Sequence, residues 1–117
     1  PHAHAASLGL AAMTVVVVFS SRRTPDDEVE YAELAARMDE LVAEQTGFVS
    51  LTSVRDPVSR RGITVGYFTD AEAVRAWREQ AEHAHARERG RQSFYEEYRV
   101  TVATVDRDYA WTAPDHG

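Results

Sequence analysis

The sequence predicts an α+β protein of ferredoxin-like topology, in which an antiparallel sheet carries its helices on one face in the order β-α-β-β-α-β. Three observations lead to this prediction. Runs of β-branched and aromatic residues occupy four segments, two amphipathic segments of helical periodicity separate them, and a short linker rich in turn residues joins the middle two runs. A chain of 117 residues is one domain by size.

The first half of the chain contains one strand and one helix. Met13–Phe19 is a β-branched run, typical of a strand buried on both faces or at a dimer core. A helix is expected to begin at Thr24, which can act as its cap and is followed by acids that suit the positive end of the helix dipole. Apolar residues recur at helical spacing over Tyr31–Val42, and Gly47 ends this helix.

The second half begins with a predicted hairpin. Strands are expected at Phe48–Arg55 and Ile63–Phe68, with an Asp-Pro and Gly turn between them. A capping-box match at Thr69 then starts a second helix, which is expected to run to about Arg89.

Ser93–Asp108 is predicted to be a long last strand. Phe94 and Tyr98 are expected on one of its faces and Tyr95 on the other. Residues 1–12 are interpreted as an N-terminal tail, loosely held or introduced by cloning, and residues 110–117 as a C-terminal tail. Residues 13–109 are then the folded domain.

Composition excludes several classes of function. The formal net charge of -6 argues against a nucleic-acid partner or an anionic membrane surface. The absence of Lys excludes Schiff-base chemistry, and the absence of Cys excludes disulfides, thiolate metal sites and cysteine nucleophiles. No apolar run approaches the ~20 residues of a membrane helix. These features favour a cytoplasmic protein without a membrane partner.

Rings and titratable groups are concentrated between Tyr67 and Tyr98. His83 is the best general base, because histidine titrates near neutral pH, although its position also fits the surface of a helix. Trp77 has the spacing of a core residue and fits a ligand contact as well. On one continuous helix Trp77 and His83 would point about 240° apart, so they can converge only if the helix breaks near Ala81.

Other polar groups in this block have ordinary interpretations too. His83 and His85 would diverge on a helix, so no metal site is expected. The alternating arginines that end at Arg91 are typical of a solvated helix end, and Arg91 could also bind an oxyanion. Tyr95 and Tyr98 fit either pocket phenols or strand aromatics.

The block resembles the antibiotic biosynthesis monooxygenase family. The residues that carry the resemblance are Ala73, Trp77, Glu82, His83, Gly90, Arg91, Tyr95, Tyr98, Val100 and the sequence Arg107-Asp108-Tyr109. The resemblance implies a dimeric α+β barrel, in which two sheets of a homodimer stack face to face and the last strand reaches across to the partner. It also implies a small pocket between helices and sheet. The best-studied members of this family oxidise polycyclic phenols to quinones with O₂ and no cofactor.

The resemblance therefore predicts a cofactor-independent monooxygenase that oxidises a small phenolic or otherwise electron-rich substrate, with no cofactor and no metal. His83 would remove the substrate proton, and Trp77 with Tyr67 or Phe94 would hold the ring. Arg91 or Tyr95 would stabilise developing negative charge, and Tyr98 would also line the site.

The chain departs from the family in having no Asn. Haem-degrading members use an Asn, a Trp and an axial His, and spacing from Trp77 places the axial position nearer Arg87 than His83. Haem degradation is therefore disfavoured. Quinone-forming members also use an Asn beside the Trp. Two alternatives remain: a non-catalytic dimer that binds a small apolar ligand or serves as an accessory protein, and an isomerase or lyase on the same barrel.

Overall fold

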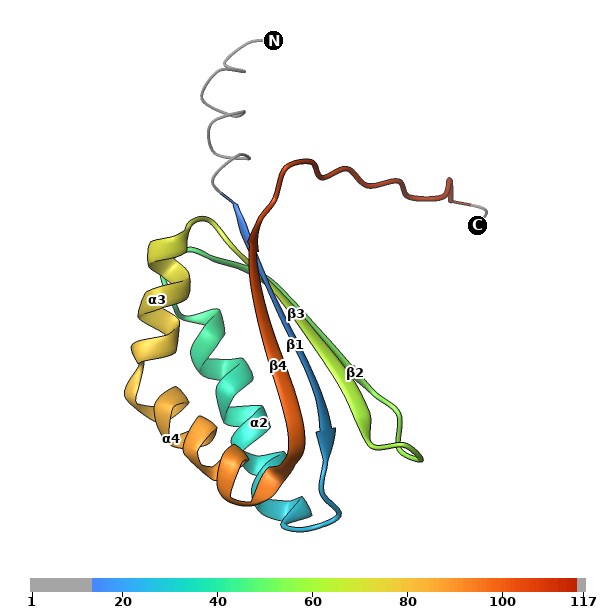
Figure 1. Cartoon of the computed structure of the whole chain (residues 1–117). Coiled ribbons are helices and arrows are strands. Elements are labelled where there is room, and N and C mark those ends of the chain that lie inside the picture. Colours follow the sequence, from blue (N-terminus) through green and yellow to red (C-terminus); the bar gives the residue numbers. More distant parts are fainter. Residues whose placement is uncertain (1–13, 116–117) are drawn as a thin grey trace, which may run out of the picture.

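The computed structural model describes residues 14–115, which form a four-stranded antiparallel sheet with helices on one face (Figure 1). The elements follow in this order: β1 (Val15–Arg23), α2 (Glu28–Ala43), β2 (Phe48–Arg55), β3 (Arg61–Phe68), α3 (Ala71–Glu79), α4 (Ala81–Arg89), the π-helix η1 (Gly90–Phe94) and β4 (Tyr95–Thr104). The predicted fold is confirmed, with the second helix divided into two.

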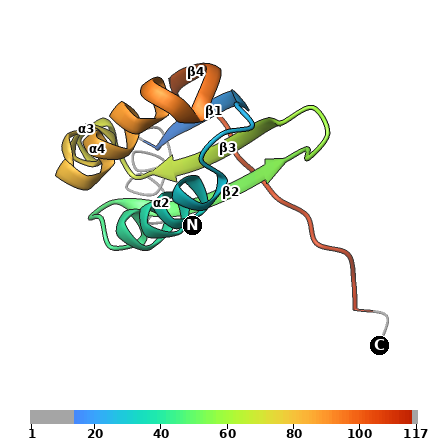
Figure 2. The same ribbon diagram turned by 90° about the horizontal axis from the view of Figure 1, so that it is seen from below.

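The sheet has a covered face and an open face. Its strands lie in the order β2-β3-β1-β4. In the register of β1, Val17 is paired with Val102, and Val16 is paired with Tyr67. Because side chains alternate along a strand, these two pairs lie on opposite faces. Val17 packs against the core, so its side is the covered face and the side of Val16 is the open face. Figure 2 shows the helices together on one side of the sheet.

The core lies between the covered face and the helices. Its buried centre consists of Val42 from α2, Phe68 from β3 and Ala73 from α3. Partly buried apolar side chains surround this centre, namely Val17, Phe48, Leu51, Val74 and Trp77. Trp77 therefore packs against the core, as its spacing from Ala73 predicts. A ligand could be contacted only by the part of the Trp77 side chain that faces away from the core.

Gly47 allows two loops to meet beside this core. Its φ of 86° is a conformation that side chains rarely adopt. A Cβ at this position would lie 2.6 Å from the Cβ of Ala73. The carbonyl of Gly47 accepts the amide of Thr69 at 2.7 Å, which joins the loop after α2 to the loop before α3.

The predicted start of the first helix is wrong. This helix, α2, begins at Glu28, and Asp27 precedes it in the left-handed region without a side-chain cap. Thr24, the expected cap, donates its hydroxyl to the carbonyl of Ser93 at 2.7 Å and accepts the amide of Asp26 at 3.2 Å. These contacts hold the chain in a turn before the helix, so Thr24 is not available to cap it.

The second predicted helix is divided at Gln80. Its first part, α3, is capped by Asp70 and not by Thr69, because the Asp70 carboxylate accepts the amide of Ala73 at 2.8 Å. Gln80 follows α3 with a ψ of 130°, outside the helical region, and α4 starts at the next residue. The helix therefore breaks immediately before Ala81, without a proline.

The last strand is shorter than predicted, since β4 spans Tyr95–Thr104 and not Ser93–Asp108. Phe94 belongs to η1. The ladder between β1 and β4 shifts register at this point, which brings Tyr95 onto the covered face beside Tyr98, with 6.0 Å between the ring centroids. The prediction that these two tyrosines lie on opposite faces is therefore wrong.

The predicted N-terminal tail, residues 1–12, lies outside the described residues. After β4 the chain runs without helix or strand to residue 115, as Figure 1 shows. Tyr109 and Trp111 on this C-terminal arm are 86% and 80% exposed. Within residues 14–115, no helix combines the length and the apolar character that a membrane span requires.

Candidate functional site

Trp77 and His83 meet at the helix break. Their rings stack with 4.2 Å between centroids and 12° between planes. Nδ1 of His83 lies 2.9 Å from the carbonyl oxygen of Trp77, and the side-chain oxygen of Gln80 accepts the amide of His83 at 2.8 Å. The change of direction at Gln80 thus brings together two residues that a continuous helix would separate.

The surroundings of His83 keep its ring neutral. Burial is the main cause that lowers the pKa of His83, and the charges of Arg87 and Arg78 lower it further. The hydrogen bond to the Trp77 carbonyl acts in the opposite direction. A carbonyl oxygen can only accept, so Nδ1 carries the proton in this contact and Nε2 of the neutral ring carries a lone pair. His83 is therefore in the form that can accept a proton.

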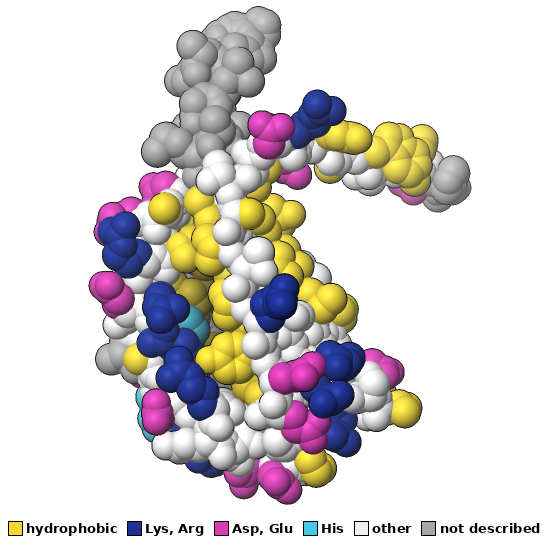
Figure 3. Space-filling view, in the orientation of Figure 1, with side chains coloured by type: hydrophobic (Ala, Val, Ile, Leu, Met, Phe, Trp, Pro, Cys, Tyr) yellow, Lys and Arg dark blue, Asp and Glu magenta, His cyan; other side chains and the backbone are white. Residues whose placement is uncertain are grey.

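A groove separates this ring pair from β4. Val100 and Val102 lie on the covered face, as the pairing of Val102 with Val17 shows, yet they are 48% and 53% exposed. The helices therefore leave this side of β4 uncovered. Figure 3 shows the hollow between α3–α4 and β4, with apolar side chains in its floor, a histidine in its wall and arginines along its rim. We call it the α3–α4 groove.

Aromatic residues gather at the end of the groove near η1, with ring centroids 5.3 to 6.4 Å apart: Phe19, Tyr31, Phe94, Tyr95 and Tyr98. Tyr95 is the ring that contacts the other four, and Phe94, which is only 2% exposed, is closed to a ligand. Burial, followed by the neighbouring Tyr31 phenol, raises the pKa of Tyr95, which therefore remains a neutral hydroxyl. Tyr98 reaches the surface, where its hydroxyl accepts Nε of Arg91 at 3.0 Å.

Tyr67, the other residue predicted to hold a ring, does not lie with Trp77. Tyr67 is paired with Val16 on the open face, while its neighbour Phe68 is buried in the core on the covered face. The sheet therefore separates Tyr67 from the α3–α4 groove. The alternation of side chains along β3 is the physical reason.

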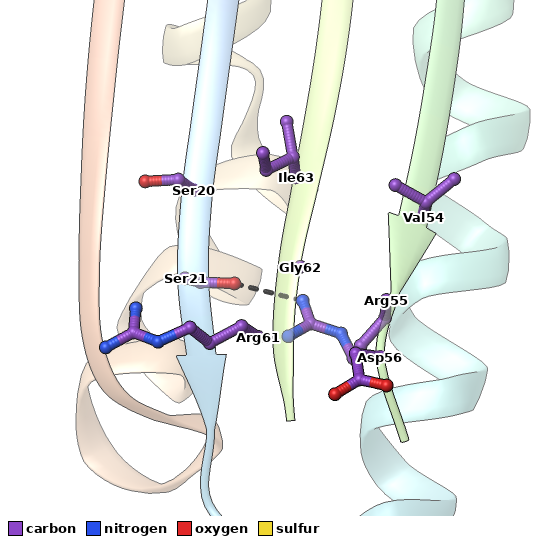
Figure 4. A pocket seen from close by; sticks show the side chains of 8 residues that line it. All are labelled: Ser20, Ser21, Val54, Arg55, Asp56, Arg61, Gly62 and Ile63. Atoms are coloured by element: carbon purple, nitrogen blue, oxygen red, sulfur yellow. Dashed lines mark hydrogen bonds between the residues drawn. The ribbon is translucent and has the colours of Figure 1, made fainter. Parts of the chain in front are cut away.

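A second hollow lies at the far end of the sheet, near the hairpin between β2 and β3. It has a volume of about 450 Å³, and Figure 4 shows the residues that line it: Ser20, Ser21, Val54, Arg55, Asp56, Arg61, Gly62 and Ile63. Arg55 crosses it to donate to the hydroxyl of Ser21 at 3.0 Å. None of the predicted site residues lines this hollow.

Arg87 belongs to the run of alternating arginines that the sequence predicts to be a solvated helix end, but it is partly buried. Its Nε and Nη1 atoms are buried and have no hydrogen-bond partner among the described residues. The signal was present in the sequence, because Arg87 follows His83 by four residues and so shares its face of α4. His85, two residues after His83, is exposed instead. Within residues 14–115, no three potential metal-ligating side chains come together.

The sheet order and the position of the helices define a ferredoxin-like α+β protein, with a groove between the helices and β4 on its covered face. Residues 14–89 match the model of the antibiotic biosynthesis monooxygenase family. The chain belongs to this family, which confirms the resemblance stated from the sequence.

Individual relatives agree with this assignment. The chain is 46% identical over 91 residues to the uncharacterized protein YqjZ of Bacillus subtilis, a match that covers 78% of each protein. The crystal structure of SnoaB, a cofactor-independent oxygenase from Streptomyces nogalater, superposes with a TM-score of 0.69 at 20% identity, over 83% of this chain and 97% of SnoaB. Rv0793 from Mycobacterium tuberculosis superposes with a TM-score of 0.72 at 14% identity, over 83% of this chain and 99% of Rv0793. At these identities the structural matches establish the fold.

Proposed function

We propose that the protein is a cofactor-independent monooxygenase that oxidises a small phenolic or similarly electron-rich substrate with O₂ in the α3–α4 groove. The observation that carries this proposal is the pair of stacked rings at the helix break, where a neutral imidazole lies beside an open, apolar groove. The family and the likeness to SnoaB support the same reaction class.

His83 is the general base in this mechanism. Its Nδ1 is occupied by the Trp77 carbonyl, so Nε2 takes the proton of the substrate hydroxyl. The same carbonyl then stabilises the imidazolium, and the indole face of Trp77 adds a cation–π contact at the stacking distance of 4.2 Å. The base is therefore assisted in its charged state by the residue that also forms the wall for the substrate ring.

The deprotonated substrate supplies the electrons for the reaction. One electron passes from the anion to O₂, and the resulting radical and superoxide combine to form a C–O bond at the ring. Loss of water from this hydroperoxide gives the quinone, so one oxygen atom enters the product and the other leaves as water. The proton held on His83 is returned when the water forms.

The polar groups at the η1 end of the groove suit negative charge. Arg91 reaches the groove through the hydroxyl of Tyr98, and the neutral hydroxyl of Tyr95 is a donor deeper in the cluster. Arg91 and Tyr95 keep their predicted role in this proposal, with Tyr98 as the contact at the surface. Tyr67 and Phe94 have no part in it, since one lies across the sheet and the other is closed off.

The open face is the proposed dimer interface. Val54 and Ile63 on this face are 67% and 47% exposed, and Tyr67 lies in the same row. An apolar sheet face of this kind is normally covered in a soluble α+β protein. Stacking of two such faces in a homodimer would cover it, as the family resemblance implies.

The test of the enzymatic proposal is O₂ consumption by the purified, chelator-treated protein with a panel of dihydroxy-aromatic compounds. We expect one O₂ consumed for each quinone formed, and a decrease of about 10²- to 10⁴-fold in rate for His83→Ala. His85→Ala is the matched control and should leave the rate unchanged, because His85 is exposed on the other side of α4. Absence of O₂ uptake across the panel, or an unaffected His83→Ala variant, would refute the proposal.

A non-catalytic ligand-binding protein is the second candidate. The absence of Asn favours it, since the oxygenases of this family use that amide beside the Trp. Binding of the same aromatic compounds in the groove without O₂ uptake, and without any change in the bound compound, would identify this function.

A further inference from the structure

Arg87 differs from the other buried or half-buried arginines in its contacts. Arg23 is 3% exposed and donates to the carbonyl of Phe94, to the carbonyl of Asp26 and to the carboxylate of Glu28. Arg89, two residues after Arg87, holds Glu30 with two bonds of 2.6 and 2.7 Å. Arg87 has two buried nitrogens and no acceptor for either among the described residues.

Two buried guanidinium nitrogens without an acceptor among the described residues need an explanation. Buried polar atoms in native proteins are nearly always hydrogen-bonded, and a charged donor without an acceptor is costly. Neighbouring acids of α4 do not satisfy Arg87, because Glu82 pairs with Arg37, and Glu88 receives a bond from Gln92. The missing acceptor is therefore best supplied by a molecule that enters the groove.

The position of Arg87 connects this acceptor with the proposed base. Arg87 lies one helical turn after His83 on the same face of α4, and its charge is felt by the His83 ring. Arg91, near the Tyr98 hydroxyl, continues the same cationic edge toward η1. The groove thus has an apolar floor, a histidine in its wall and arginines along its edge.

We propose that the α3–α4 groove takes an aromatic substrate that carries a carboxylate, and that Arg87 binds this carboxylate beside the hydroxyl presented to His83. The planar guanidinium matches a carboxylate in shape and in charge. An acid with the hydroxyl on the neighbouring ring carbon reaches both residues from one side of α4. The role given to His83 rests on the proposed function, whereas the preference for a carboxylate rests only on Arg87 and the groove.

The preference can be measured by titration calorimetry on the whole protein near neutral pH. The matched probes are 1-hydroxy-2-naphthoate and 1-naphthol, which share the ring system and the hydroxyl and differ in the carboxylate. We expect wild type to bind the naphthoate about ten- to a hundredfold more tightly. Arg87→Gln should remove this preference and leave naphthol binding unchanged, while Arg87→Lys should keep part of it. Arg75→Gln, which removes an exposed arginine of α3, should keep all of it.

Each contrary result refutes the inference. Equal affinity of wild type for the two probes, binding of neither, or an Arg87→Gln variant with the full preference would do so. Displacement of the naphthoate by an equal concentration of inorganic phosphate would show that the site selects a free anion and not an aromatic acid. Binding is measured without turnover, so a preference without O₂ uptake would refute the enzymatic proposal and leave this inference standing.

Discussion

Two arginines, Arg23 before α2 and Arg87 in α4, differ in whether their buried nitrogens have acceptors. Near η1, Arg23 is enclosed, lies 3.8 Å over the ring of Tyr31, and has acceptors for all three of its nitrogens. In the last turn of α4, Arg87 has two buried nitrogens that lack acceptors among the described residues. A satisfied buried cation fixes structure, and an unsatisfied one marks a place where a ligand completes the protein. Arg23 therefore supports the fold, and Arg87 is the arginine for which we propose a ligand.

The largest expected effect on stability comes from replacing Arg23, the arginine whose nitrogens all have acceptors. Arg23→Met should lower the free energy of unfolding by about 3 kcal/mol, because it removes three hydrogen bonds donated by a buried guanidinium and takes the cation from the Tyr31 ring. Urea unfolding measures this change. Arg22→Met is the control, since Arg22 is partly exposed and forms surface ion pairs worth about 0–1 kcal/mol. Equal losses in the two variants would contradict the structural role of Arg23.

The helix break is expected to respond more weakly. Gln80→Ala removes the side chain that caps α4 and should lower the free energy of unfolding by about 1 kcal/mol. The near-ultraviolet circular dichroism of Trp77 should change as well, because the ring pair loses its support. Gln92→Ala, at an exposed glutamine, should change neither quantity. A Gln80→Ala variant with an unaltered tryptophan signal would show that the break does not depend on this cap.

A change of stability in the opposite direction is expected at Arg87, whose buried nitrogens lack acceptors among the described residues. Arg87→Met should raise the free energy of unfolding by up to about 1 kcal/mol, because it keeps the apolar stem and removes donors that have no acceptor. Urea unfolding of Arg87→Met and Arg23→Met under identical conditions measures the contrast directly. If Arg87→Met lost as much stability as Arg23→Met, the distinction between the two arginines would not hold.

A change of pH should alter the stability of the protein through His83 at the helix break. The pKa of His83 is lowered below its ordinary value of 6.5, so in the interval beneath 6.5 the unfolded chain binds a proton that the folded chain does not. Stability should therefore fall as the pH falls through this interval, and His83→Gln should flatten the dependence. Unfolding midpoints measured from pH 7.5 down to 5 check it, with His85→Gln as the control that retains the wild-type slope.

The sequence predicted the fold well where local signals decide structure. The strand Phe48–Arg55 has the predicted bounds, because its periodicity and the turn after it are both local. Two predictions were wrong: that Thr24 caps the first helix, and that Tyr95 lies on the face opposite Tyr98. A contact of Thr24 with η1 and a register shift before Tyr95 override the local sequence pattern there. These are tertiary effects that no short window of sequence contains.

The site was predicted in part. Trp77 and His83 were predicted to meet only if the helix breaks, and the break and the contact between their rings are both present. The sequence could not decide it, because the break occurs at Gln80 without the proline that would have signalled it. Tyr67 was predicted to lie near them because it belongs to the same stretch of sequence. Side chains alternate between the two faces of a strand, and Tyr67 lies on the open face. Arg87 was hidden in a charged run that is usually solvated. Its lack of an acceptor among the described residues distinguishes it from Arg89, which is also partly buried but bonds Glu30. The roles of these residues stay predictions.

The attachment of α4 to α2 has a consequence for the solution conditions. Arg37–Glu82 near the start of α4 and Arg89–Glu30 at its end join the two helices through ion pairs at the surface. Attraction between exposed charges is weakened by dissolved salt, whereas apolar packing around Phe68 is not. Ionic strength therefore sets how firmly one wall of the groove is held, so the groove can widen in concentrated salt while the sheet keeps its shape.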